Sequence, residues 1–313
     1  MQARHWTGGR SPDREESMAR YECPGFTLGC TSFVRPASYV EGVRFGAALC
    51  RDVSVLLFES GAHGECPLTE REAREIARIG DGEGTTFSVH LPVDGDFSTP
   101  EGALRVQRGA LAAVDRAAPL RAHSFVLHVA FPACTAEGRA VTGAEAARAA
   151  AVLESIGRAL PSPGCLALEN LEGYGPGFLD PWLNGAHAGP APGWARCADI
   201  GHLWKDFRQG GRSASRPGER PAGRLGSPDP PAVLADWLPR VRICHLHGVR
   251  LCGDTARDHV SLAHMPVDQL DAALHLLWER AFSGVVTLEV FSPEHLAASH
   301  RAILESHERF TQS

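Results

Sequence analysis

Short apolar runs alternate with amphipathic segments from Thr27 to the end of the chain. Each run is apolar at consecutive positions, which is typical of parallel strands buried on both faces. The pattern predicts eight strands, over residues 27–33, 53–59, 86–91, 124–129, 165–170, 196–200, 241–247 and 285–291. Between them, apolar residues recur at helical spacing.

The helices have recognisable starts. Thr69 followed by Glu72, and Thr142 followed by Glu145, predict capping boxes ahead of alanine-rich segments. Residues 98–101 (STPE) predict a third, with proline in the first turn.

About eight strand-and-helix units predict a parallel sheet, and eight such units close a barrel. An open doubly wound sheet is the alternative, but no glycine-rich phosphate loop follows the first strand. We therefore predict one α/β domain, a single parallel (β/α)8 TIM barrel over residues 25–313, after a disordered tail at 1–24. Residues 209–231 have almost no apolar side chains, so we expect a mobile insertion there, either a loop or a lid.

Composition narrows the function. The formal net charge of −6 argues against a broad nucleic-acid surface, which needs a basic field. No run approaches the ~20 apolar residues of a membrane helix, and the first twenty residues lack the apolar core of a secretion signal. The nine cysteines form no CxxC pair, so we expect a reduced, cytoplasmic protein. The oligomeric state stays open.

Polar residues gather where the predicted strands end. In order along the chain they are Glu59, His90, His128, Glu169, Asp199, His245 and Glu289, with His202 three residues after Asp199 and Asp258-His259 in the loop expected after the seventh strand. Active sites of such barrels lie at the carboxyl ends of the strands. Converging imidazoles and carboxylates are costly to bury without compensation, and a divalent cation compensates both.

The number of candidates indicates more than one ion. One divalent cation is satisfied by about four to six ligands. The larger set here, His90, His128, Glu169, Asp199, His202, His245, Asp258, His259 and Glu289, therefore predicts two or three ions. Its imidazole content favours zinc, manganese or iron over magnesium.

These segments resemble the xylose-isomerase-like barrel superfamily, and within it the endonuclease IV branch (AP endonuclease family 2). The resemblance covers nearly all of residues 27–291 and rests on Ser-Val-His90-Leu-Pro, Leu-His128, Leu-Glu169-Asn170-Leu-Glu-Gly, Asp199-Ile-Gly-His202, Cys-His245-Leu-His247 and Leu-Glu289-Val. The ligands on strands five to eight are also similar to those of sugar isomerases and epimerases. His90 and His128 favour the polynuclear, phosphoester-cleaving branch.

A closer resemblance is to the cobamide-remodelling phosphodiesterase (CbiR) family. It rests on Leu-Gly-Cys-Thr-Ser-Phe-Val-Arg-Pro, Val-Ser-Val-Leu-Leu-Phe-Glu59-Ser and Phe-Ser-Val-His90-Leu-Pro. The resemblance implies a small corrinoid substrate, whose nucleotide-loop phosphoester is hydrolysed with loss of the lower-ligand nucleoside.

Two departures separate this chain from the repair endonucleases. Those enzymes place Asp-x-His after strand seven, whereas Asp258 and His259 are adjacent here, and strand seven ends in His-Leu-His instead of Asn-Asp. We assign His247 and Asn170 to substrate binding. For His247, a supporting bond to a metal ligand or an outward surface position stays open.

The predicted mechanism is metal-assisted hydrolysis. Glu169 is assigned as a bridging ligand and Glu289 as the carboxylate that closes the site. Glu59 is assigned to catalysis, with its role between proton acceptor and substrate contact left open. The alternatives are an abasic-site endonuclease, a single-metal sugar isomerase or epimerase, and a corrinoid-binding protein without activity.

Overall fold

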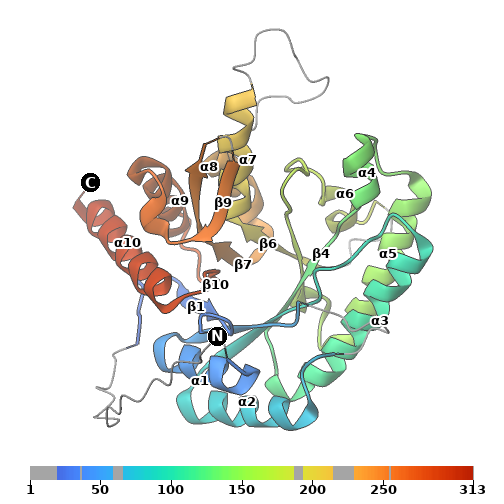
Figure 1. Cartoon of the computed structure of the whole chain (residues 1–313), viewed down its shortest axis with the longest axis horizontal. Helices are drawn as coiled ribbons and strands as arrows, with labels where there is room; N and C mark the ends of the chain where they lie inside the picture. The colour runs from blue at the N-terminus through green and yellow to red at the C-terminus, as the bar shows by residue number, and fades with distance from the viewer. Residues whose placement is uncertain are drawn as a thin grey trace, which may run out of the picture.

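The computed structural model describes residues 20–35, 37–58, 66–186, 193–213, 229–253 and 255–312. Within them, eight parallel strands close into a barrel in the order β1-β10-β7-β6-β5-β4-β3-β2, with helices around it (Figure 1). The strands are β1 (Thr27–Thr31), β2 (Asp52–Leu56), β3 (Thr86–His90), β4 (Ser124–His128), β5 (Leu166–Glu169), β6 (Ala195–Asp199), β7 (Val241–Leu246) and β10 (Val285–Leu288). The eight predicted strands and the predicted barrel are confirmed.

The helices are α1 (Tyr39–Leu49), α2 (Glu70–Glu83), α3 (Pro100–Ala117), α4 (Pro132–Glu137), α5 (Gly143–Ala159), α6 (Asp180–Leu183), α7 (Ile200–Ser213), α8 (Pro230–Trp237), α9 (Val267–Glu279) and α10 (Pro293–Gln312). The capping boxes at Thr69 and Thr142 are confirmed. At the third predicted start, Thr99 caps α3 by accepting from the Gly102 backbone N–H. A capping box is absent there because Gly102 has no side chain to return the bond.

The barrel separates its side chains by alternation along each strand. One large apolar cluster fills the layer between strands and helices. A small cluster inside the barrel consists of Val126, Ala167, Ala195, Cys197, Ile243 and Val285. Each of these lies two or four positions before a polar strand end, so the same strand face carries apolar packing below and polar groups at the mouth.

Strand register aligns the polar ends. His128 is paired with Glu169 across β4 and β5, and Asp199 with His245 across β6 and β7. Residues paired in register lie side by side on one face of a sheet. The predicted ligands therefore form a layer at one end of the barrel.

An antiparallel hairpin follows β7, where the sequence predicted a loop. Its strands are β8 (Gly248–Cys252) and β9 (Thr255–Val260), and it packs against α7 (Figure 1). Asp258 and His259 therefore lie on a strand. Alternating residues of a two-stranded ribbon point to opposite faces, which the short polar sequence did not reveal.

The two segments predicted to be mobile are only partly described. Residues 1–19 lie outside the described residues, but Arg20 and Tyr21 pack on the barrel, contrary to the predicted tail. The Arg20 guanidinium donates to the Ala47 carbonyl over 2.8 Å, and the Tyr21 N–H donates to Leu49 over 2.7 Å. Of the predicted insertion, residues 209–213 continue α7 and Pro230 begins α8, while 214–228 lie outside the described residues.

The nine cysteines form no disulfide, and Cys30, Cys165, Cys197 and Cys244 are buried in the apolar layers, where a thiol packs as a small apolar side chain. In the described part of the chain, every helix is too short or too polar to cross a lipid bilayer.

Two glycines inside helices offer a matched test of the packing. A Cβ on Gly42 in α1 would lie 2.0 Å from the Ser32 carbonyl oxygen, whereas a Cβ on Gly82 in α2 would meet nothing within 4 Å. We expect Gly42→Ala to lower the free energy of unfolding by about 1–3 kcal/mol through overpacking. Gly82→Ala should raise it by up to about 1 kcal/mol, since alanine favours helix. Urea denaturation measures both, and equal effects would contradict the close packing of α1 on the loop after β1.

Candidate metal centre

Six neighbouring strands deliver the polar groups to the mouth of the barrel. His90 ends β3, His128 ends β4, Glu169 ends β5, Asp199 ends β6, His245 lies near the end of β7, and Glu289 follows β10. His202 lies in the first turn of α7, His247 follows β7, and His259 lies on the hairpin. Most of these side chains are buried. The structure thus gathers residues that are far apart in the sequence.

Glu169 is the contact point of four histidines. Its Oε2 lies 3.0 Å from Nε2 of His90 and 3.2 Å from Nε2 of His128. Its Oε1 lies 3.2 Å from Nδ1 of His245 and 3.9 Å from Nδ1 of His202. Each carboxylate oxygen therefore faces a different pair of imidazoles.

The described residues form five groups of possible ligand atoms, with the atoms of each group within 4.8 Å of one another, and three of these groups together cover the site. These three are His90, His128 and Glu169; Glu169, Asp199, His245 and Glu289; and His202, His247 and His259. The first two share Glu169. The predicted bridging position of Glu169 therefore has the geometry it needs.

Three of the histidines are oriented by backbone carbonyls. Nδ1 of His90 lies 2.8 Å from the Leu91 oxygen, and Nδ1 of His202 lies 2.9 Å from the Asn170 oxygen. Nδ1 of His259 likewise lies 3.1 Å from the Glu289 carbonyl oxygen. A carbonyl only accepts, so each Nδ1 carries the proton, and in a neutral ring Nε2 presents a lone pair. This outer hydrogen bond is characteristic of metal-binding histidines.

Asp199 is held by two of its neighbours. The Asn170 amide donates to the Asp199 carbonyl over 2.9 Å and accepts from the Asp199 N–H over 2.8 Å. Nε2 of His247 lies 3.3 Å from Asp199 Oδ1. Both ends of the Asn170 amide are thus used to join β5 to β6, and His247 supports Asp199 while also lying within ligand spacing of His202 and His259.

Gly201 makes room for His247. A Cβ at this position would lie 2.1–2.4 Å from three atoms of the His247 ring. The ring therefore lies directly against the first turn of α7, where only glycine fits. The outward-facing position that the sequence left open for His247 is excluded, because the side chain is fully buried.

The hairpin presents His259, and Asp258 has a different partner. His259 has φ +48, an uncommon conformation for a residue other than glycine, and its N–H donates to Nδ1 of His247 over 3.1 Å. Asp258 pairs with Lys205 of α7, which also donates to Glu172 over 2.6 Å. Among the described residues, Asp258 belongs to none of the groups of closely spaced ligand atoms.

The charges of the cluster reinforce one another. Burial raises the pKa of Glu169, but the opposite effect of His245 and His128 is larger. The pKa of Glu169 therefore lies well below its usual range. Burial likewise opposes the ionisation of Asp199, yet His202 and His247 bring its pKa to about 2. Against the effect of burial, Asp199 and Glu169 raise the pKa of His202 to about 9.

The residues present fit divalent cations. Asp199 Oδ2 and His245 Nε2 are buried and make no hydrogen bond. When the His90 ring is neutral, the lone pair of Nε2 lies 3.0 Å from a carboxylate oxygen, and two acceptors in contact need either a shared proton or a cation. Buried imidazoles and carboxylates are the ligands of zinc, manganese and iron, so the donor set suits such ions.

Some expected residues fall outside this set, and some unexpected ones fall within it. Glu59 lies outside the described residues, so its assignment stays a prediction. Cys197 lies within ligand spacing of Glu169 and His245, but burial raises the pKa of its thiol to about 12. Lys205 was not predicted as a residue of the site. The feature of the sequence that could have indicated it is its position one helical turn after His202.

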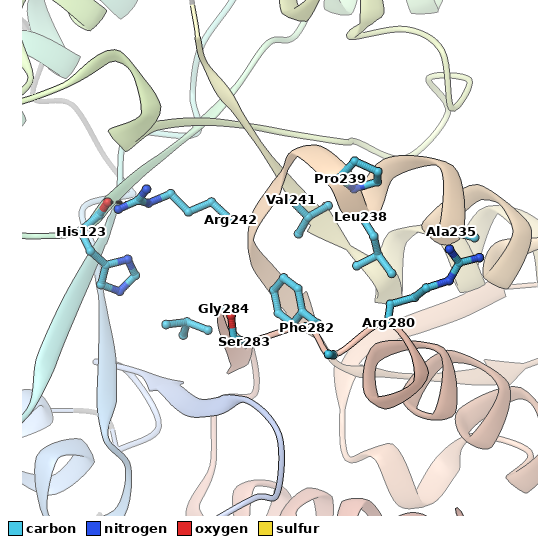
Figure 2. Close-up of a pocket in the computed structure, with 12 residues that line it drawn as sticks. His123, Ala235, Leu238, Pro239, Val241, Arg242, Arg280, Phe282, Ser283 and Gly284 are labelled. Carbon is cyan, nitrogen blue, oxygen red and sulfur yellow. Dashed lines mark hydrogen bonds between the residues drawn. The ribbon is translucent and has the colours of Figure 1, made fainter.

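A large cavity lies at the opposite end of the barrel. Its volume is about 650 Å³, and it is lined by residues at the starts of β7 and β10 and by His123 ahead of β4. Figure 2 shows Arg242 and His123 on one side of Phe282 and Arg280 on the other. The active sites of such barrels lie at the other end, at the carboxyl ends of the strands, and this cavity contains none of the predicted site residues.

Comparison with known proteins places the chain in a family. Residues 53–312 match the family AP_endonuc_2, described as a xylose isomerase-like TIM barrel. The chain belongs to this family, whose members are enzymes that often bind divalent metals. No curated protein matches the sequence.

Solved structures share the fold at low sequence identity. A D-tagatose 3-epimerase-like protein has a TM-score of 0.69 at 15% identity, covering 92% of this chain and 99% of that one. A xylose isomerase domain protein from Planctomyces limnophilus has a TM-score of 0.62 at 13% identity, with 92% and 98% coverage. AP endonuclease, family 2 from Brucella melitensis has a TM-score of 0.54 at 12% identity, with 90% and 98% coverage. These similarities support the barrel and leave the reaction open.

Metal binding should release protons. Because the pKa of His202 is about 9 in the metal-free protein, this ring is mostly protonated at about pH 8, and a cation binds only the neutral ring. Apparent metal affinity should therefore rise with pH up to about 9. Titration calorimetry at about pH 8, in two buffers of different ionisation enthalpy, should report at least one proton released per protein. Identical heats in both buffers would contradict this.

Proposed function

We propose that the protein is a metal-dependent phosphodiesterase that hydrolyses the nucleotide-loop phosphoester of cobamides, using two or three divalent ions, zinc first among them. The observation that carries the proposal is the shared carboxylate: Glu169 Oε2 faces His90 and His128, while Oε1 faces His245. Adjoining cation sites suit in-line displacement at phosphorus. We place this activity on a small corrinoid in the cytoplasm.

The residues of the chain divide the work. Bound cations supply Lewis acidity, which acidifies water and neutralises charge that develops on the phosphoryl oxygens. Glu169 joins the two groups, and Glu289 closes the site, with Oε2 3.5 Å from Nδ1 of His245. His247 contacts the carboxylate of Asp199, and Asn170 accepts a hydrogen bond from its backbone N–H, so the two residues together hold Asp199 in place.

A sugar epimerase is the main alternative. Glu169, Asp199, His245 and Glu289 form a group that is complete for one cation, and several similar structures are described as epimerases. That reading leaves His90 and His128 beside Glu169 without a function. Burying two imidazoles against one carboxylate has a cost that a second cation would offset.

An abasic-site endonuclease fits the charge distribution less well. A duplex-binding enzyme contacts many phosphates through lysine and arginine, and this chain has a net charge of −6. In the described part of the mouth, Lys205 is already paired with Glu172 and Asp258. A compact phosphodiester needs no extended basic surface.

Metal content tests the polynuclear site. Reconstituted protein should contain more than one equivalent of transition metal by elemental analysis, because the ligand groups exceed the needs of one ion. Glu169→Gln combined with His128→Ala should lose both metal and activity. His295→Ala, on α10 outside the ligand groups, is the control and should retain both. One equivalent or less in the wild type would favour the epimerase.

The substrate is tested by assaying the candidate substrates side by side. Metal-loaded protein should convert a complete cobamide to a cobinamide-level product, followed by chromatography, and should leave an abasic-site duplex intact. Glu289→Gln should reduce the rate by about 100-fold or more, as expected for loss of a group at the reacting centre. Nicking of the duplex with the corrinoid unchanged would establish the endonuclease instead, and corrinoid binding without turnover would indicate a binding protein.

A further inference from the structure

Aromatic side chains border the metal centre on one side. Phe33 follows β1, Phe58 follows β2 and Phe291 follows β10, and we call these three rings the aromatic wall. The rings of Phe33 and Phe58 are stacked, with centroids 6.4 Å apart and planes 9° apart. Phe58 and Phe291 meet edge to face at 6.5 Å, and Tyr39 packs against Phe33 at 5.6 Å. The wall is therefore one continuous surface.

The wall touches the ligand groups at both ends. The Phe58 ring lies 5.4 Å from the ring of His90, which belongs to the first group. The Phe291 ring lies 5.3 Å from the ring of His259, which belongs to the third group. A substrate that reaches the ligands from this side passes across the wall.

The mouth of the barrel thus has a sector of candidate metal ligands and a sector of aromatic rings. Among the described residues, the ligands come from β3, β4, β5, β6, β7, the segment after β10, α7 and β9. The described ends of β1 and β2 contribute Phe33 and Phe58 instead. Because β10, β1 and β2 are neighbours in the barrel, the three rings occupy one sector.

The wall is open to solvent at Phe291, which is 38% exposed. The other exposed large apolar residues of the described chain, Leu104, Val267 and Leu304, lie on outer helices. Single exposed apolar residues are common on protein surfaces, but Phe291 continues a row of contacting aromatic rings that borders a polar cluster, and this combination is characteristic of ligand sites. Phenylalanine rings favour planar partners, which they contact by offset stacking or edge to face.

We infer that the aromatic wall is a substrate subsite that selects phosphodiesters carrying a planar, apolar ring within reach of the wall when the scissile phosphate lies at the ligand groups. The inference rests on the proposed phosphodiesterase function and adds the substrate class that this site prefers. The phosphate lies at the ligand groups, and the ring covers Phe291 and Phe58. Small aliphatic phosphodiesters reach the same ligands but leave the wall exposed.

Two synthetic esters test the subsite. Bis(4-nitrophenyl) phosphate and methyl 4-nitrophenyl phosphate release the same 4-nitrophenolate and differ in the retained group. Phe291→Ala should lower the ratio of kcat/KM for the aromatic over the methyl ester by about fivefold, mainly through KM. Phe291→Tyr should restore the ratio, because the ring is kept. Leu104→Ala, an exposed apolar residue on α3, is the control and should leave it unchanged.

The outcomes separate the subsite from the reaction. If both esters are hydrolysed and Phe291→Ala leaves the ratio unchanged, the subsite is wrong and the phosphodiesterase stands. If the metal-loaded wild type hydrolyses neither ester, the phosphodiesterase is wrong. The binding of phosphate ligands then tests the aromatic wall separately. Measured by calorimetry, Phe291→Ala should weaken the binding of 1-naphthyl phosphate about fivefold relative to the binding of methyl phosphate. Equal affinities for the two probes in the wild type would overturn the subsite.

Discussion

The burial of one carboxylate against several imidazoles is the constraint on which the site depends. Glu169 is almost fully buried, and His90, His128 and His245 lie within 3.2 Å of its two oxygens. Isolated charges are expensive to bury, so these groups are stable only as a set that shares protons or cations. The depressed pKa of Glu169 and the raised pKa of His202 express the same mutual attraction.

The barrel positions these side chains through the register of its strands, and contacts from neighbouring backbone atoms and residues then orient them. Paired strand ends bring His128 beside Glu169 and Asp199 beside His245. Backbone carbonyls then fix the rings of His90 and His202, and the space left by Gly201 fixes His247. Because these ligands have supporting contacts, their geometry is set before any ion binds, which is how precise sites are built on rigid elements.

The strand ends could be predicted from the sequence because buried parallel strands are continuous apolar runs, and a polar residue such as His90 or Glu169 interrupts them visibly. Other features depend on contacts between distant segments. The strand that carries His259, β9, has few apolar residues, and the pairing of Asp258 with Lys205 depends on how the hairpin packs on α7. Likewise, Phe33, Phe58 and Phe291 become one surface only through the order of β10, β1 and β2.

The central claim is that Glu169 joins two adjacent cations, and electron paramagnetic resonance of the manganese-substituted protein tests it most directly. A carboxylate shared by two Mn²⁺ ions couples their spins. The fully loaded wild type should therefore give an exchange-coupled spectrum, which Glu169→Gln should convert to the signal of isolated ions. Isolated Mn²⁺ signals from the fully loaded wild type would show that the ligand groups act separately and would contradict the account.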